Sequence, residues 1–175
     1  LILAGVDVVG LANNHMMNYG PEAMFQTIEI LDKAGIAHSG AGANLAEAHK
    51  PGIVERNGVR VGVLSYTSVF TKGWAATRER PGLATVRVEA SYRPYYRGDE
   101  MPGSPYDFET HPDPKDVAQL EADIRSARSQ VAPTVFASGE KVLPRSETSA
   151  GVRQRMRSFA GAAAPLISGL LVTFQ

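Results

Sequence analysis

Residues 1–35 contain the pattern that most restricts the fold, a short apolar run that leads through a polar loop into an amphipathic stretch. The apolar run starts after Gly5 and predicts a strand covered on both faces; it contains Val6, Val8, Val9 and Leu11. Pro21 suits the first turn of a helix, and Gly35 suits its end. Apolar residues at spacings of three and four predict one buried helix face, made of Met24, Phe25, Ile28 and Leu31. A strand, a loop and a helix in this order indicate an α/β fold.

The loop between this strand and helix carries Asn14 and His15 where α/β enzymes keep their reactive groups, at the carboxyl end of a strand. Amide oxygen and neutral imidazole nitrogen both bind borderline divalent cations, and a protonated imidazole stabilises an oxyanion. Asn-rich loops also use their side chains to satisfy backbone groups, and His15 is then an incidental neighbour. The loop supplies fewer ligands than a metal site needs, so its residues alone leave both interpretations open.

Several motifs in a fixed order resemble the CapA family of capsule-synthesis proteins, also called poly-γ-glutamate synthesis proteins. They are the loop at 13–20, the GIAHSGAG turn at 35–42 and the EAHKP segment at 47–51. The resemblance continues through Tyr66 and, more loosely, to the helix near Gln130. That family resembles the calcineurin-like metallophosphoesterases, which hold a two-metal centre at the ends of their strands. The resemblance implies an α/β fold, an incomplete metallophosphoesterase-like layered α/β/β/α sandwich.

The resemblance also implies roles for two residues of the loop. Asn14 would be a metal ligand, and His15 the catalytic group that faces the phosphate and stabilises or protonates the leaving oxygen. The implied cofactors are divalent metal ions, Mn, Zn or Fe, in the intact family domain. The loop departs from the family at Asn18, where the family commonly has Asp, and this removes a possible charge near the loop.

Other parts of the family's ligand set are absent from this sequence. The family begins with a Gly-Asp motif upstream, whereas this chain opens at Leu1, so we expect the amino-terminal part to be missing. The family also has a His-Trp-Gly strand end and a later Gly-His-x-x-His motif, but no histidine here lies beyond His111. We therefore expect metal binding by this chain to be weak or absent, and the chain alone not to be a competent enzyme.

Three functions remain open from the sequence. The first is a CapA-like metallophosphoesterase that hydrolyses or transfers phosphoester-linked envelope intermediates. The second is a non-catalytic assembly or export factor for capsular polymer, and the third is an inert fragment. The family implies the capsule or polyglutamate biosynthesis machinery as partner, the bacterial cell envelope as location, and membrane association of a full-length protein. The 18 basic and 18 acidic residues balance, so charge gives no case for nucleic acid binding.

Residues 36–66 are predicted to form structural elements without a direct part in chemistry. Ile36 to Ser39 predicts a strand, residues 40–42 a glycine turn, and Asn44 to Ala48 a short helical turn. Asn57-Gly58 between the β-prone runs 52–56 and 59–66 predicts a hairpin, whose second strand has one more exposed face. We interpret His38 as a structural or rim residue, and Glu47 and His49 as solvated groups without a catalytic role.

We expect a partial CapA-like metallophosphoesterase domain at 1–139 and an atypical tail at 140–175. Within the domain, aromatics set among Pro, Gly and Arg indicate a long surface insertion at 67–114, which either contacts a substrate or is anchored by its aromatics. A helix at 116–130, capped by Asp113 or Asp116, and a strand at 131–137 complete the domain. The tail is basic and then apolar, which indicates disorder or a shifted reading frame rather than a membrane span.

Overall fold

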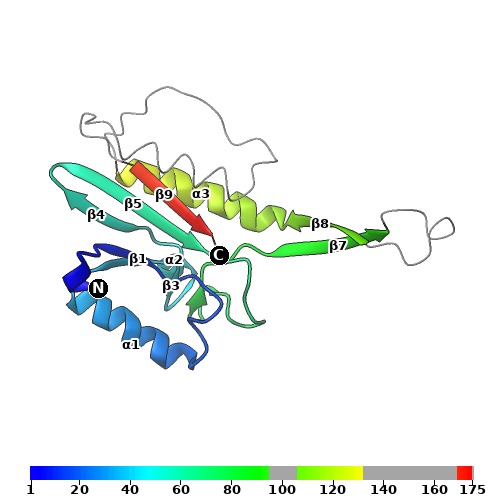
Figure 1. The fold of residues 1–175 in the computed structure, drawn as a ribbon, viewed down its shortest axis with the longest axis horizontal. Coiled ribbons are helices and arrows are strands. Elements are labelled where there is room, and N and C mark those ends of the chain that lie inside the picture. The colour runs from blue at the N-terminus through cyan, green and yellow to red at the C-terminus, as the bar shows by residue number, and fades with distance from the viewer. Residues whose placement is uncertain (95–105, 132–168, 175) are drawn as a thin grey trace, which may run out of the picture.

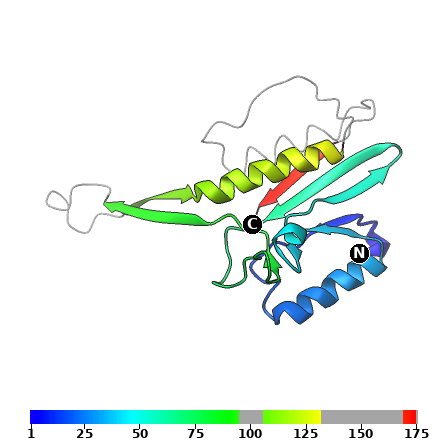
Figure 2. The same cartoon turned by 180° about the vertical axis from the view of Figure 1, so that it is seen from behind.

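Strands lie between two long helices in a computed structural model of the chain, which describes residues 1–94, 106–131 and 169–174 (Figure 1). Helix α1 (Gly20–Lys33) lies against strands β1 (Val8–Gly10) and β2 (Ala37–Ser39). Helix α3 (Pro114–Gln130) lies along β5 (Val59–Tyr66) on the opposite side of the molecule, as the reverse view in Figure 2 also shows. The α/β class is therefore confirmed, whereas the specific metallophosphoesterase sandwich stays a prediction.

The amino-terminal unit has the predicted order of strand, loop and helix. After a 3-10 turn, η1 (Ile2–Ala4), β1 pairs in parallel with β2, from Val8 opposite Ala37 to Gly10 opposite Ser39. Helix α1 buries Met24 and Leu31, but Phe25 is 39% exposed and lies outside the buried face that we expected. Val8 and Val9 are only half-buried, because the described part of this sheet has just two strands. The strand and helix are confirmed, and their predicted burial was too extensive.

The glycine segment at 40–42 is more ordered than a simple turn. Only Gly40 has a left-handed φ, of 100°, while β3 (Ala41–Gly42) pairs antiparallel with β6 (Gly82–Leu83). The short helix α2 (Leu45–Ala48) follows as predicted, and Asn44 caps it by accepting a hydrogen bond from the Glu47 N–H.

The predicted hairpin forms from β4 (Gly52–Arg56) and β5, which pair antiparallel. Both turn residues, Asn57 and Gly58, have left-handed φ values of 52° and 77°, as a tight hairpin requires. The second strand has no exposed face at its carboxyl end, since every residue from Gly62 to Tyr66 is buried. This differs from the prediction because β5 is a central strand with a neighbour at each edge.

The second neighbour of β5 comes from the tail. Strand β9 (Gly169–Phe174) pairs with β5 in parallel, from Val61 opposite Gly169 to Tyr66 opposite Phe174. The expected disorder of the tail therefore does not hold for residues 169–174. The boundary at 139, the remainder of the tail and the strand predicted at 131–137, apart from the buried Val131, lie outside the described residues.

The predicted insertion at 67–114 has two parts of different character. Its first part packs into the body of the protein, where Thr67, Leu83 and Ala84 are completely buried. Its second part is the antiparallel pair β7 (Val88–Pro94) and β8 (Tyr106–Pro112), which projects away from the body in Figure 1. Only the second part therefore has the surface position that we expected.

Two apolar clusters flank the strands. The first packs α1 against β1 and is built on Leu11, Met17, Met24, Leu31, Ile36, Ala41 and Leu83. The second packs α3 against β5 and is built on Ala48, Leu64, Tyr66, Ala76, Ala84, Val86 and Ala127. Asp113 caps α3 as predicted, accepting hydrogen bonds from the Lys115 and Asp116 N–H groups.

Candidate functional site

The carboxyl ends of β1, β2 and β5 converge on Gly40. A Cβ atom at this position would lie 2.6 Å from the Ala12 nitrogen and 2.9 Å from the Ser65 Cβ. The Leu11 N–H donates to the Ser39 carbonyl at 2.8 Å, and the Ala12 N–H donates to the Ser65 Oγ at 3.3 Å. The candidate loop therefore leaves a tightly packed junction of three strands.

The loop at 13–20 is held by its own short-range hydrogen bonds. The Asn13 Oδ1 accepts from the His15 N–H at 2.8 Å, and its Nδ2 donates to the Leu11 carbonyl at 3.3 Å. The Asn18 N–H donates to the His15 carbonyl at 3.0 Å, while the buried Met17 anchors the loop in the first apolar cluster. The side chain of Asn13 therefore pairs with the backbone of the loop, whereas those of Asn14 and His15 do not have to.

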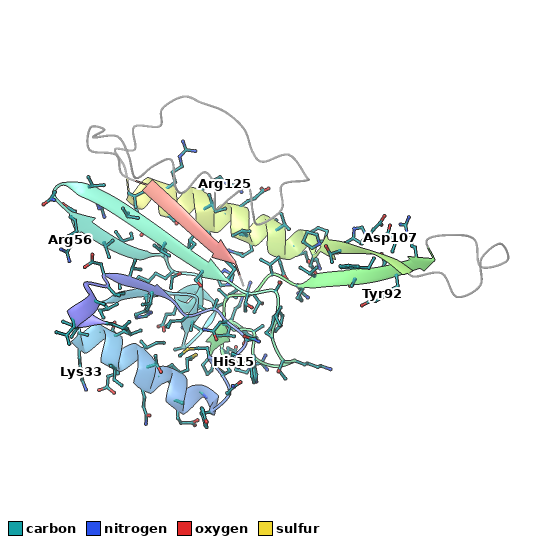
Figure 3. All side chains as sticks on the ribbon, in the orientation of Figure 1. His15, Lys33, Arg56, Tyr92, Asp107 and Arg125 are labelled. Carbon is teal, nitrogen blue, oxygen red and sulfur yellow. The ribbon has the colours of Figure 1, made fainter. Side chains whose placement is uncertain are left out.

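Asn14 and His15 are both exposed in the loop that follows β1. Figure 3 labels His15 in this loop. The Asn18 Nδ2 lies 3.0 Å from the His15 Nδ1. Because an amide nitrogen only donates, Nδ1 is the acceptor, and the proton of the neutral ring sits on Nε2. His15 therefore carries an N–H donor on the ring edge away from Asn18.

The described residues do not by themselves fit a two-metal centre around this loop. No group of three or more His, Cys, Asp or Glu side chains that could hold a metal ion is present in the described part of the chain. The other histidines pair with carboxylates elsewhere: His38 lies 3.2 Å from Asp32, and His111 lies 3.5 Å from Glu109. Asn14 and His15 remain the two groups of the loop itself with metal-binding or phosphate-binding chemistry.

A second polar cluster was missed by the sequence analysis. The His49 Nδ1 lies 2.7 Å from the Asp123 Oδ2, and the same oxygen accepts from the Tyr66 hydroxyl at 2.7 Å. The Gln119 Nε2 donates to the Asp123 Oδ1 at 2.9 Å. We name these four residues the His49 cluster; it joins the end of α2 to β5 and α3.

The His49 cluster is mostly buried, with 10% of the His49 side chain and 15% of the Asp123 side chain exposed. Burial raises the pKa of Asp123, but the hydrogen bonds from His49, Tyr66 and Gln119 outweigh it and keep that pKa below its ordinary value. Burial, and then the bond to Asp123, raise the pKa of Tyr66. The cluster therefore holds a mostly buried carboxylate among three hydrogen-bond donors.

The interpretation of His49 as a solvated group was wrong. Its partner Asp123 lies 74 residues further along the chain, so local spacing gave no sign of the contact. The ring of His49 also meets that of Tyr66 edge to face, with centroids 5.4 Å apart. The only local signal was the half-buried character of α2, where Ala48 is fully buried next to His49.

The chain is similar in sequence to bacterial capsule-synthesis proteins. A family model described as "Bacterial capsule synthesis protein PGA_cap" matches residues 1–169. The "Capsule biosynthesis protein CapA" of Bacillus anthracis is 40% identical over 86 residues, which are 49% of this chain and 21% of that protein. The "PGA biosynthesis protein CapA" of Bacillus subtilis is 38% identical over 83 residues, which are 47% of this chain and 22% of that protein.

A third relative is the "Probable polyglutamine synthesis accessory protein" of Mycobacterium tuberculosis, 37% identical over 87 residues, 47% of this chain and 23% of that protein. The matched part of this chain thus spans less than a quarter of the length of these curated relatives. Within the described residues, no helix is both long and apolar enough to cross a membrane.

Proposed function

The chain belongs to the family of bacterial capsule synthesis proteins, PGA_cap, and on this basis we propose that it performs phosphoester chemistry at the Asn14–His15 loop. The setting that we propose is the synthesis of a capsule or of poly-γ-glutamate, as in the names of its relatives. We further propose that the protein acts with that biosynthetic machinery at the bacterial cell envelope.

The observation that carries this proposal is the state of the His15 ring. The Asn18 amide occupies Nδ1, so the neutral ring offers an N–H donor at Nε2 from an exposed position at a strand end. A donor of this kind hydrogen-bonds a phosphoryl oxygen, and the doubly protonated ring transfers one proton to a leaving alkoxide and becomes neutral.

Asn14 lies beside His15 and has the same exposure, and we propose its Oδ1 as a ligand for a divalent metal such as Mn, Zn or Fe. Bound metal would polarise a phosphoester oxygen. The described residues supply too few ligands around Asn14 for a closed site. The 175-residue chain should accordingly bind Mn²⁺ with a dissociation constant above about 100 µM by calorimetry. Stoichiometric binding far tighter than this would contradict the proposed ligand set.

The test of the chemistry is hydrolysis of bis(p-nitrophenyl) phosphate, with added Mn²⁺, by the protein at its full encoded length. Removing a general acid typically costs about 100-fold or more in rate, so we expect His15→Ala to lose at least that factor. The matched control is His111→Ala, because His111 is exposed on β8 and belongs to neither the loop nor the His49 cluster.

The outcomes separate the three functions that the sequence left open. Hydrolysis that survives His15→Ala would contradict the proposed role of His15. A wild-type protein that hydrolyses nothing, but whose deletion abolishes capsular polymer in cells, would identify a non-catalytic assembly or export factor. A wild-type protein that hydrolyses nothing, and whose deletion leaves the capsular polymer unchanged, would be inert.

A further inference from the structure

A polar pocket of about 520 Å³ opens between α2, α3 and the segment that carries Arg78. Pockets of this size hold small organic molecules. Its described lining includes two basic side chains, Lys50 and Arg78, and a single carboxylate, Asp123. The pocket shares His49 and Asp123 with the His49 cluster but includes no residue of the Asn14–His15 loop.

The two basic side chains of the pocket form no ion pair with other described residues. The Asp123 carboxylate keeps its negative charge while it accepts the hydrogen bonds of the His49 cluster, so it offsets only one of the two positive charges. The pocket therefore presents a net positive charge that the described residues leave uncompensated. Basic groups of this kind bind carboxylate or phosphate oxygens through charge-assisted hydrogen bonds.

His49 adds a buried polar group to the wall of the pocket. Its side chain is nine-tenths buried, at 10% exposure, and its Nδ1 is occupied by Asp123. Its Nε2 has no hydrogen-bond partner in the part of the chain that the structure describes. Because a carboxylate only accepts, Nδ1 carries the proton and the Nε2 of the neutral ring is an acceptor, so His49 forms the wall of the pocket rather than a bond to an anionic oxygen.

A further donor comes from the cap of α2. The Asn44 Oδ1 accepts from the Glu47 N–H, so the cap does not use its Nδ2, and Asn44 is one of the residues that line the pocket. We infer from these groups that the pocket is a binding site for a small oxyanion, carried by a carboxylate or a phosphate group, with Lys50 and Arg78 as its binding groups. This site is separate from the proposed phosphoester chemistry.

The experiment is a calorimetric titration of the protein with two probes, inorganic phosphate and glutarate. We expect at least one probe to bind with a dissociation constant below about 1 mM. Arg78→Ala and Lys50→Ala should each weaken that binding about 5- to 10-fold, as the loss of one charge-assisted bond predicts. Both side chains are exposed, so the unfolding midpoint should not change. The stronger probe identifies the oxyanion as a carboxylate or a phosphate.

The matched control is Arg80→Ala. Arg80 lies two positions after Arg78 and carries the same charge, but its side chain does not line the pocket. His15→Ala should leave binding unchanged, so this result is independent of the proposed function. The inference would be overturned if neither probe showed saturable binding, or if Arg78→Ala and Arg80→Ala lost the same amount of affinity for the probe.

Discussion

The Asn14–His15 loop and the His49 cluster each hold a histidine by a hydrogen bond to its Nδ1, but in opposite surroundings. The partner of His15 is the amide of Asn18, three residues away, and the ring is exposed. The partner of His49 is the carboxylate of Asp123, 74 residues away, and the ring is nearly buried. The first arrangement orients a group toward solvent, whereas the second ties two helices and a strand together.

This difference predicts different consequences when each region is changed. Exposed side chains held by local bonds contribute little to the free energy of unfolding, so Asn14, His15 and Asn18 can be truncated without unfolding the protein. A mostly buried carboxylate with three donors contributes substantially, because its loss removes the acceptor of all three hydrogen bonds. The variants below test this separation, from the largest expected effect to the smallest.

Gly40→Ala should affect both regions and have the largest effect. The Gly40 N–H donates to the Ala48 carbonyl next to His49, and an added Cβ would lie 2.6 Å from the backbone nitrogen of Ala12, just before the loop. Steric overlap and the left-handed φ together should cost about 3 kcal/mol of unfolding free energy, measured by urea denaturation.

The matched control is Gly58→Ala, which also has a left-handed φ but has no other atom within 4 Å of the added Cβ. It should cost only about 1 kcal/mol. If Gly40→Ala and Gly58→Ala lost the same unfolding free energy, the strand ends would not meet as closely at Gly40 as described.

Asp123→Ala should destabilise the protein by about 2 to 3 kcal/mol in the same measurement. The change leaves the Nδ1 of His49, the hydroxyl of Tyr66 and the amide of Gln119 without their acceptor. Glu121→Ala removes an exposed carboxylate from the same helix, 3.5 Å from Arg125, and should cost less than about 0.5 kcal/mol. If both changes cost the same, the His49 cluster is not a stabilising unit.

Because the pKa of Asp123 is lowered, the stabilisation that the His49 cluster provides should depend on pH, with a smaller effect than that of Asp123→Ala. A carboxyl whose pKa is lowered by folding stabilises the protein above its ordinary pKa and loses this contribution as the pH falls through the folded-state value. The difference in unfolding free energy between wild type and Asp123→Asn should therefore narrow below about pH 4. Asp116, whose pKa is lowered by Arg87, remains in both proteins and cancels in this difference. A difference that widens in acid would contradict the assigned sign.

Asn18→Ala should have the smallest effect on stability, below about 0.5 kcal/mol, because it changes an exposed side chain. It removes the donor to the His15 Nδ1, so the neutral ring should populate both tautomers. Nitrogen NMR of the imidazole measures this directly. A tautomer that stays fixed at Nε2–H would show that Asn18 does not orient His15.

The extent to which each region was predictable follows from the range of its contacts. The strand, loop and helix at residues 8–33 and the Asn57-Gly58 hairpin were predicted because their signals are periodicity and turn chemistry, which act over a few residues. The pairing of β9 with β5 and the bond from His49 to Asp123 were not predicted, because they join residues far apart in the sequence. Phe25 was misplaced for the same reason, since periodicity gives a helix face but not how much of it a partner covers.

The most direct test of the central claim compares His15→Ala with Tyr66→Phe in the protein at its full encoded length. Unfolding free energy and phosphodiester hydrolysis per folded molecule are measured for both variants. We predict that His15→Ala loses hydrolysis about 100-fold with its stability unchanged. Tyr66→Phe, which deletes the hydroxyl bonded to Asp123, should lose about 1 kcal/mol of stability and keep its hydrolysis. Hydrolysis that is retained in His15→Ala, or lost only in proportion to unfolding, would contradict the claim that the loop carries the chemistry.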